Sequence, residues 1–191
     1  MRNTKYARMI ILLFVCLLTA GCSGAKTILT KMQKAYSAQE NIRLELSMVV
    51  SDGDVSAPYR LEQVQTAAGA RFTILEPEII GGITAEMTAA GLTFAGAHVA
   101  VQTMPVGYTP FDLAYFAIET LKDTHFTTVG RERLGDTDAF IIEKNVQVYE
   151  KNLRVNLWLN AETYQLMKYE FFDDGSRVLE ANVAAFEVQA D

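Results

Sequence analysis

The residues able to do acid–base or metal chemistry are few and scattered in this chain. Its two histidines, His98 and His125, are far apart in the sequence, and both lie in stretches with a strand-like pattern. The sequence contains none of the motifs HExxH, GxSxG, GxxxxGK(S/T) or CxxC, which mark zinc, nucleophile, phosphate and thiol sites. No motif pairs a nucleophile with a base, so we expect the histidines to have surface or packing roles.

Two pairs of neighbouring acids are the other candidates for catalysis. Glu76 and Glu78 flank Pro77, and Asp173 and Asp174 precede a glycine in a predicted turn. Acids at such loop positions are usually solvated, whereas a catalytic carboxylate needs a partner and a shielded site. We therefore expect a protein that is not an enzyme, with no catalytic residues, no metal site and no cofactor.

Cys22 is the residue for which the surrounding sequence indicates a covalent modification. Residues 1–8 carry three basic side chains and no acid, and the apolar run 9–18 is shorter than the roughly 20 residues needed to cross a bilayer. A basic start, a short apolar core and the small pair Ala20-Gly21 are typical of a secretory signal. With Cys22 next, the segment resembles a bacterial lipoprotein signal, which is cleaved before a lipid-bearing cysteine. A plain cleaved signal and an uncleaved membrane anchor are the alternatives.

Lipidation of Cys22 would have consequences for the whole chain. Each buried CH₂ contributes about 0.8 kcal/mol, so two or three acyl chains on one residue hold a protein firmly at a membrane. Cys16 lies in the segment to be removed, so the mature domain has no cysteine for a disulfide. We expect residues 1–21 to be the signal peptide, and the mature protein to be anchored at the extracytoplasmic face of the cell membrane.

The mature chain, residues 22–191, is acidic. Removal of the three basic residues of the signal leaves 14 Lys and Arg against 23 Asp and Glu, a net charge of −9. This charge argues against nucleic acid as a partner and against binding to anionic lipid by charge alone. No Pro-, Gly- or Ser-rich linker divides the chain, so we expect a single domain.

Two segments have helical patterns. In residues 25–38, apolar side chains recur at steps of three and four. In residues 110–122, Thr109 can cap the helix, Pro110 suits its first position and Asp112 favours its positive end. This second helix is apolar nearly all round, so we expect it to be buried on more than one side or to cover something apolar.

Most of the remaining chain alternates with the period of two that is typical of strands. In NIRLELSMVVS, for example, Ile42 and Met48 share one face and Arg43 the other. Turn signals such as Asp52-Gly53-Asp54 and Asp173-Asp174-Gly175 separate about ten strands by short connections, which favours antiparallel pairing. So many strands must curl. The sequence thus predicts an α+β, mostly β domain: a curved antiparallel sheet with a helix over its concave face.

Large apolar side chains are in excess in these regular elements. Most of them must form core, but a helix with several apolar faces under a curved sheet can also enclose a cavity for acyl chains. The pattern alone does not separate a filled core from a hollow one, so both interpretations stand. The candidate lining residues are Leu44, Leu46, Met48, Phe72, Ile74, Met87, Phe94, Phe111, Tyr115, Phe116, Ile118 and Leu157.

Two stretches resemble the LolA/LolB-like lipoprotein-carrier superfamily. RFTILEPEIIGGITAEMTAAGLTFAG, residues 71–96, is similar to the middle of the family, where a strand and an x-P-E turn lead to a short hairpin. The C-terminal part of the family's sequences is similar to residues 157–188, LWLNAETYQLMKYEFFDDGSRVLEANVAAFEV. The resemblance implies one domain over residues 22–191, an unclosed β-barrel with an N-terminal and a mid-chain helix covering its concave face.

The resemblance also implies a function. In this family the acyl chains of a lipid or a lipoprotein lie between sheet and helices, and the cysteine points to the anchored members. In pattern the chain is most similar to Gram-positive members such as the GerS-like germination lipoproteins. They imply an alternative, a non-catalytic protein that binds and regulates a cell-wall amidase during sporulation or germination.

Overall fold

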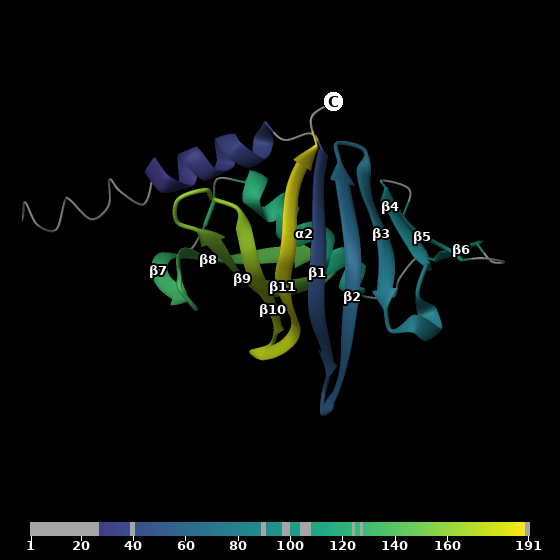
Figure 1. Cartoon of the computed structure of the whole chain (residues 1–191). Coiled ribbons are helices and arrows are strands. Elements are labelled where there is room, and N and C mark those ends of the chain that lie inside the picture. The colour runs from purple at the N-terminus through teal and green to yellow at the C-terminus, as the bar shows by residue number, and fades with distance from the viewer. Residues whose placement is uncertain are drawn as a thin grey trace, which may run out of the picture.

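The computed structural model describes residues 27–38, 41–88, 91–96, 100–103, 108–123, 125–126 and 128–189. Within these ranges, eleven strands form one antiparallel sheet in the order β6-β5-β4-β3-β2-β1-β11-β10-β9-β8-β7 (Figure 1). The predicted class, a mostly β antiparallel sheet with two α-helices, is confirmed. The strands are β1 (Asn41–Asp52), β2 (Val55–Thr66), β3 (Gly69–Glu76), β4 (Thr84–Thr88), β5 (Gly91–Ala95), β6 (Ala100–Thr103), β7 (Thr128–Leu134), β8 (Thr137–Val148), β9 (Lys151–Asn160), β10 (Leu166–Asp173) and β11 (Ser176–Gln189).

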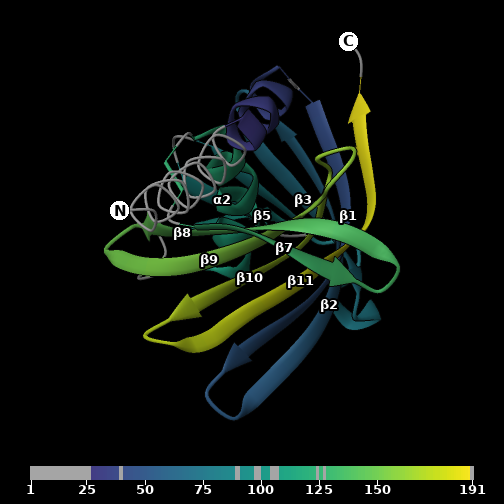
Figure 2. The ribbon, with the colours of Figure 1, turned by 90° about the vertical axis from the view of Figure 1, so that its left-hand side faces the viewer.

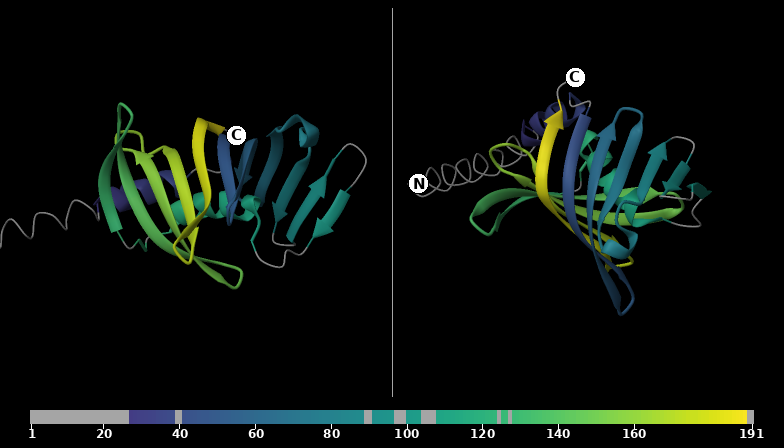
Figure 3. Two further views of the ribbon diagram at one scale, coloured as in Figure 1. Left: turned by 90° about the horizontal axis from the view of Figure 1, so that it is seen from below. Right: turned by 45° about the vertical axis from the view of Figure 1, so that its right-hand side comes forward.

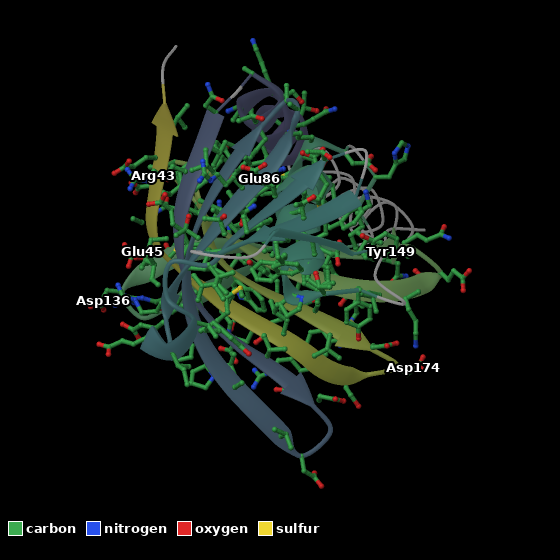
Figure 4. The ribbon with its side chains drawn as sticks, turned by 90° about the vertical axis from the view of Figure 1, so that its right-hand side faces the viewer. Arg43, Glu45, Glu86, Asp136, Tyr149 and Asp174 are labelled. Atoms are coloured by element: carbon green, nitrogen blue, oxygen red, sulfur yellow. The ribbon has the colours of Figure 1, made fainter. Side chains whose placement is uncertain are left out.

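β1 lies in the middle of the sheet, between β2 and β11. Its side chains alternate as predicted: Ile42, Leu46 and Met48 face inward and are buried, while Arg43 and Glu45 lie on the outer side (Figure 4). Because β1 pairs with β11, the first and last strands of the chain are neighbours. The rest of the sheet grows outward from this pair, because all other paired strands are consecutive in the chain.

Hairpin turns fall where the sequence predicts them. β1 and β2 meet at Gly53-Asp54, and β10 and β11 meet at Asp174-Gly175. Gly53 and Gly175 have φ angles of 59° and 84°, which residues with a side chain rarely adopt. The turn residues therefore fix where each strand reverses, and with it the register of each pair.

The sheet curls without closing. Register shifts between Glu45 and Leu46 in β1, and between Phe171 and Phe172 in β10, mark irregularities that increase the local twist. The strands follow a curved wall when the molecule is seen from below (Figure 3). β6 and β7 stand at the two ends of the strand order, so the described sheet is an unclosed barrel.

The mid-chain helix α2 (Pro110–Lys122) lies inside this curve (Figure 2). It begins as predicted, with Thr109 as its cap and Pro110 in its first turn. Asp112 completes a capping box, because its Oδ2 accepts hydrogen bonds from the backbone N–H and the hydroxyl of Thr109 (2.6 Å each). The apolar residues that α2 buries in the core are Leu113, Ala114, Ala117, Ile118 and Leu121.

The N-terminal helix, described from 27 to 37, lies across one end of the sheet (Figure 1). Met32 and Tyr36 are buried on its inner face. The Tyr36 hydroxyl donates to the Tyr164 carbonyl (3.0 Å) and accepts from the Leu166 N–H (2.9 Å). These two hydrogen bonds tie the helix to the connection between β9 and β10.

The substitution Tyr36→Phe tests this attachment. It removes the hydroxyl, so that the buried Leu166 N–H and the Tyr164 carbonyl both lose a partner. Because an unsatisfied buried polar group costs about 1–3 kcal/mol, we expect the free energy of unfolding, measured by urea titration, to fall by about 2 kcal/mol. The control is Tyr115→Phe, since the Tyr115 hydroxyl makes no hydrogen bond to another described residue. Equal losses in the two variants would contradict the attachment.

Candidate functional site

An apolar cavity of about 270 Å³ lies between the concave face of the sheet and the start of α2. Its lining comes from β1, β2, β3 and β5 of the sheet, from the first turn of α2, and from the short helix η1 (Glu78–Ile80) with the loop after it. The Tyr59 hydroxyl is the polar group among the lining side chains, so the cavity suits hydrocarbon better than a polar ligand. The lining residues are Met48, Tyr59, Leu61, Ile74, Ile80, Ile83, Phe94, Pro110 and Phe111.

The chain after β3 folds back to form the rim of this cavity. η1 ends at Gly81, and Gly82 reverses the chain with a φ of 79°. The Gly82 N–H donates to the Ile74 carbonyl (2.8 Å), and the Ile74 N–H donates to the Ile83 carbonyl (2.9 Å). These hydrogen bonds hold Ile80 and Ile83 beside β3, where both line the cavity.

Phe111 is the centre of an aromatic cluster at the first turn of α2. Its ring centroid lies 5.3 Å from that of Phe72 on β3 and 5.4 Å from that of Phe94 on β5. Phe72 is fully buried, whereas Phe94 and Phe111 are partly buried and line the cavity. Tilted and edge-to-face pairs of this kind contribute about 0.5–1.5 kcal/mol each beyond their buried area. The cluster therefore fixes the position of the Phe111 ring.

Two tyrosines fasten the start of α2 to turns of the sheet. Tyr149, in the turn between β8 and β9, donates from its hydroxyl to Asp112 Oδ1 (2.6 Å). Tyr108, just before α2, donates to Asp173 Oδ2 at the end of β10 (3.2 Å). Burial, and after it the neighbouring carboxylate, raises the pKa of each tyrosine to about 12. Both hydroxyls therefore remain protonated donors at neutral pH. Tyr149 lies on the side of the molecule away from Arg43 (Figure 4).

A polar network joins β2 to α2 beyond the cavity. Gln63 is fully buried, and its Nε2 donates to the Ala114 carbonyl (3.2 Å) and to Gln65 Oε1 (2.8 Å). Gln65 Nε2 donates in turn to Glu119 Oε1 (2.6 Å), which also pairs with Lys122 Nζ (2.6 Å). Because a buried amide is stable only when it is hydrogen-bonded, the network fixes the position of β2 relative to α2.

The structure divides the predicted lining residues into three groups. Met48, Ile74, Phe94 and Phe111 meet around the cavity. Tyr115 and Phe116 form a T-shaped pair with centroids 5.5 Å apart, and they pack against the core without lining the cavity. The remaining predicted residues lie in the buried core: Leu44, Leu46, Phe72, Met87, Ile118 and Leu157.

Five of the residues that line the cavity were not predicted from the sequence. Tyr59 and Leu61 are on β2, and the alternation of YRLEQVQTA was a signal that could have placed them on the inner face. Ile80 and Ile83 flank a pair of glycines, which mark a break in the chain but not the direction of the fold after it. The sequence marks Pro110 only as a helix start.

Among the residues considered for chemistry, His125 does not line the cavity. Cys22 and His98 are outside the described residues, so the expectations about them remain predictions. The His125 side chain is exposed, with Nδ1 3.1 Å from Asp123 Oδ1. Hydrogen bonds from Lys144 and His125 hold the pKa of Asp123 well below its usual range. Over the ranges that the structure describes, no cluster of acids, histidines and cysteines is arranged to hold a metal ion.

The described helices are short or carry charged residues. None of them is both long enough and apolar enough to cross a bilayer. The apolar run 9–18 lies outside the described residues. The prediction of a signal over residues 1–21 therefore rests on the sequence.

The convex face carries ion pairs and a second, open hollow. Arg60 pairs with Glu45 and with Glu76 (2.7 Å), so Glu76, one of the acids considered for catalysis, is engaged in a surface ion pair. Such pairs contribute about 0–1 kcal/mol. The hollow measures about 340 Å³, and Val49 and Pro77 are part of its lining. It thus offers an exposed apolar surface on the side opposite α2.

Comparison with known proteins shows likeness in structure only. No family model and no curated protein matches the sequence. The lipoprotein LppX of Mycobacterium tuberculosis aligns with a TM-score of 0.52 at 8% identity, over 88% of this chain and 98% of that one. An uncharacterized conserved protein from Thermus thermophilus aligns with a TM-score of 0.53 at 12% identity, over 88% and 89%. These two structural alignments show that the chain shares its fold with both proteins.

A LolA superfamily protein from Nitrosomonas europaea is also among the structural neighbours. It aligns with a TM-score of 0.47 at 14% identity, over 87% of this chain and 94% of that one. The nearness to GerS-like members that the sequence pattern implies stays a prediction.

Proposed function

We propose that this protein is a lipid-anchored lipoprotein of the cell envelope, and that its cavity binds an acyl chain of a lipid or a lipoprotein. The observation that carries the proposal is the apolar cavity beneath the first turn of α2. LppX, which shares the fold, is itself named a lipoprotein. We assign the protein a binding role and no catalytic one.

Removal of hydrocarbon from water would drive the binding. Each methylene group that enters the cavity contributes about 0.8 kcal/mol. Met48, with its flexible thioether chain, can adjust to the shape of the ligand. Because the lining offers one hydroxyl and no charge, the polar head of the ligand would stay at the opening, in water.

Anchoring through Cys22 is the second part of the proposal. Residues 23–26 separate this cysteine from the described helix. The five steps from Cys22 to residue 27 span at most about 18 Å, so the domain would lie close to the membrane surface. The lipid would hold the protein at the extracytoplasmic face of the cell membrane.

A tryptophan placed in the cavity tests acyl-chain binding. Ile83→Trp should fill part of the cavity and lower the affinity for a fluorescent fatty acid at least about tenfold, which corresponds to 1.4 kcal/mol. Val64→Trp is the matched control, because Val64 lies on the opposite face of the sheet and does not line the cavity. Thermal unfolding of both variants would show that they fold. Unchanged binding in Ile83→Trp, or no binding by the wild-type chain, would contradict the proposal.

The substitution Cys22→Ser tests the anchor. Without the thiol no lipid can be attached, so the protein should move from the membrane fraction to the soluble fraction. Incorporation of labelled palmitate, measured in cells that express the full chain, should disappear as well. Cys16→Ser is the control and should leave both readouts unchanged, because Cys16 belongs to the segment that is removed. Membrane retention of Cys22→Ser would refute lipid anchoring at this residue.

The alternative is a non-catalytic protein that binds and regulates a cell-wall amidase during sporulation or germination. The exposed apolar hollow around Val49 on the convex face favours it. Under this alternative, an amidase should co-purify with the wild-type protein from its native host and be lost with Val49→Asp. Acyl-chain binding should be the same in both proteins. If no amidase is captured, or if Val49→Asp captures as much, the alternative fails.

A further inference from the structure

The cavity has a closed inner end on the side of the sheet. Met48, Leu61 and Ile74 line it, one each from β1, β2 and β3. Side chains two positions apart share a face of a strand, so the next inward-facing residues mark where the cavity stops. These residues are Leu46, Gln63 and Phe72, each of them fully buried and none of them part of the lining.

α2 closes the same end from the opposite side. Phe111 is the last residue of the helix that lines the cavity, and its ring packs on Phe72. One turn further along, Ala114 is completely buried, and its carbonyl accepts the hydrogen bond from Gln63. The space between helix and sheet is therefore filled from Ala114 onward, and the apolar cavity ends at the Phe111 ring.

Gln63 makes this end polar as well as closed. Its Nε2 is hydrogen-bonded to Ala114 and Gln65, and its Oε1 has no hydrogen-bond partner among the described residues. An apolar chain that advanced past Phe111 would have to separate these groups without replacing their hydrogen bonds, which is unfavourable. The hydrogen-bonded Gln63 amide therefore opposes the entry of a longer chain, as the close packing around Ala114 also does.

We propose that this closed end sets the length of the acyl chain that the protein binds, and that Phe111 is the specificity-determining residue. A methylene group takes up about as much space as a water molecule, about 30 Å³, so the cavity holds a single chain of about nine methylenes. Any further length of the chain stays in water and adds no affinity. This inference rests on the proposed acyl-chain function.

A series of saturated fatty acids tests the limit. Octanoate, decanoate, dodecanoate, tetradecanoate and hexadecanoate compete with a bound fluorescent fatty acid on the purified mature chain. Affinity should rise about fourfold for each methylene up to about decanoate, the factor that corresponds to 0.8 kcal/mol per buried CH₂, and then level off. An affinity that rises steadily through hexadecanoate would overturn the inference and leave the proposed function standing. Failure of every member to compete would overturn both.

Substitutions of Phe111 should shift the chain length at which the affinity levels off, in opposite directions for smaller and larger side chains. Phe111→Ala removes the whole ring from the closed end, so the plateau should move to dodecanoate. Phe111→Trp fills it, so the plateau should move to octanoate or binding should weaken across the series. Phe116→Ala is the control on the same helix, because Phe116 does not line the cavity, and its plateau should stay at decanoate. Thermal unfolding confirms that each variant folds. A plateau that does not respond to Phe111 would refute its role.

Discussion

The packing of α2 against the concave face of the sheet is the interaction on which the rest of the structure depends. The described strands form one sheet, and its inner face carries large apolar side chains such as Leu44 and Leu157. Another element must bury these side chains. α2 covers them, and its completely buried Ala114 and Ala117 allow it to lie close to the strands. At its first turn the bulky Phe111 takes the place of these small residues. The same helix therefore seals the core along most of its length and leaves a space at its beginning.

Polar contacts decide where α2 lies along the sheet. Asp112 is fixed by Thr109 and Tyr149 at one end, and the Lys122 carbonyl accepts a hydrogen bond from Gln33 at the other (3.3 Å). Hydrogen bonds of this kind contribute about 0.5–1.5 kcal/mol each, far less than the burial of several large side chains. Apolar burial thus drives the helix onto the sheet, and the hydrogen bonds select one placement among many. The volume of the cavity follows from that placement.

Much of the fold was predictable from local pattern, and most of the site was not. The alternation around Met48, the glycine turns and the Thr109 cap are signals of neighbouring residues, and the structure has each of them where the sequence places it. Whether a large side chain packs in the core or lines the cavity depends on contacts between residues that are far apart in the sequence. Phe72 and Ile74 illustrate this, because they share a face of β3, yet one is packed under Phe111 and the other lines the cavity. The burial of Gln63 was not predictable either, since a polar residue is usually exposed. A shared fold does not supply the missing information, because one fold serves many functions.

The direction of β1 bears on how an anchored molecule would meet its ligand. The strand begins at Asn41, next to the N-terminal helix, and reaches the cavity at Met48 (Figure 1). Seven steps of about 3.3 Å put about 23 Å of strand between the two. The closed end of the cavity, at Leu46, lies two residues nearer to this helix than Met48 does. An acyl chain that enters the cavity would therefore advance toward the N-terminal helix, and its polar head would stay on the side of the cavity that is farther from this helix.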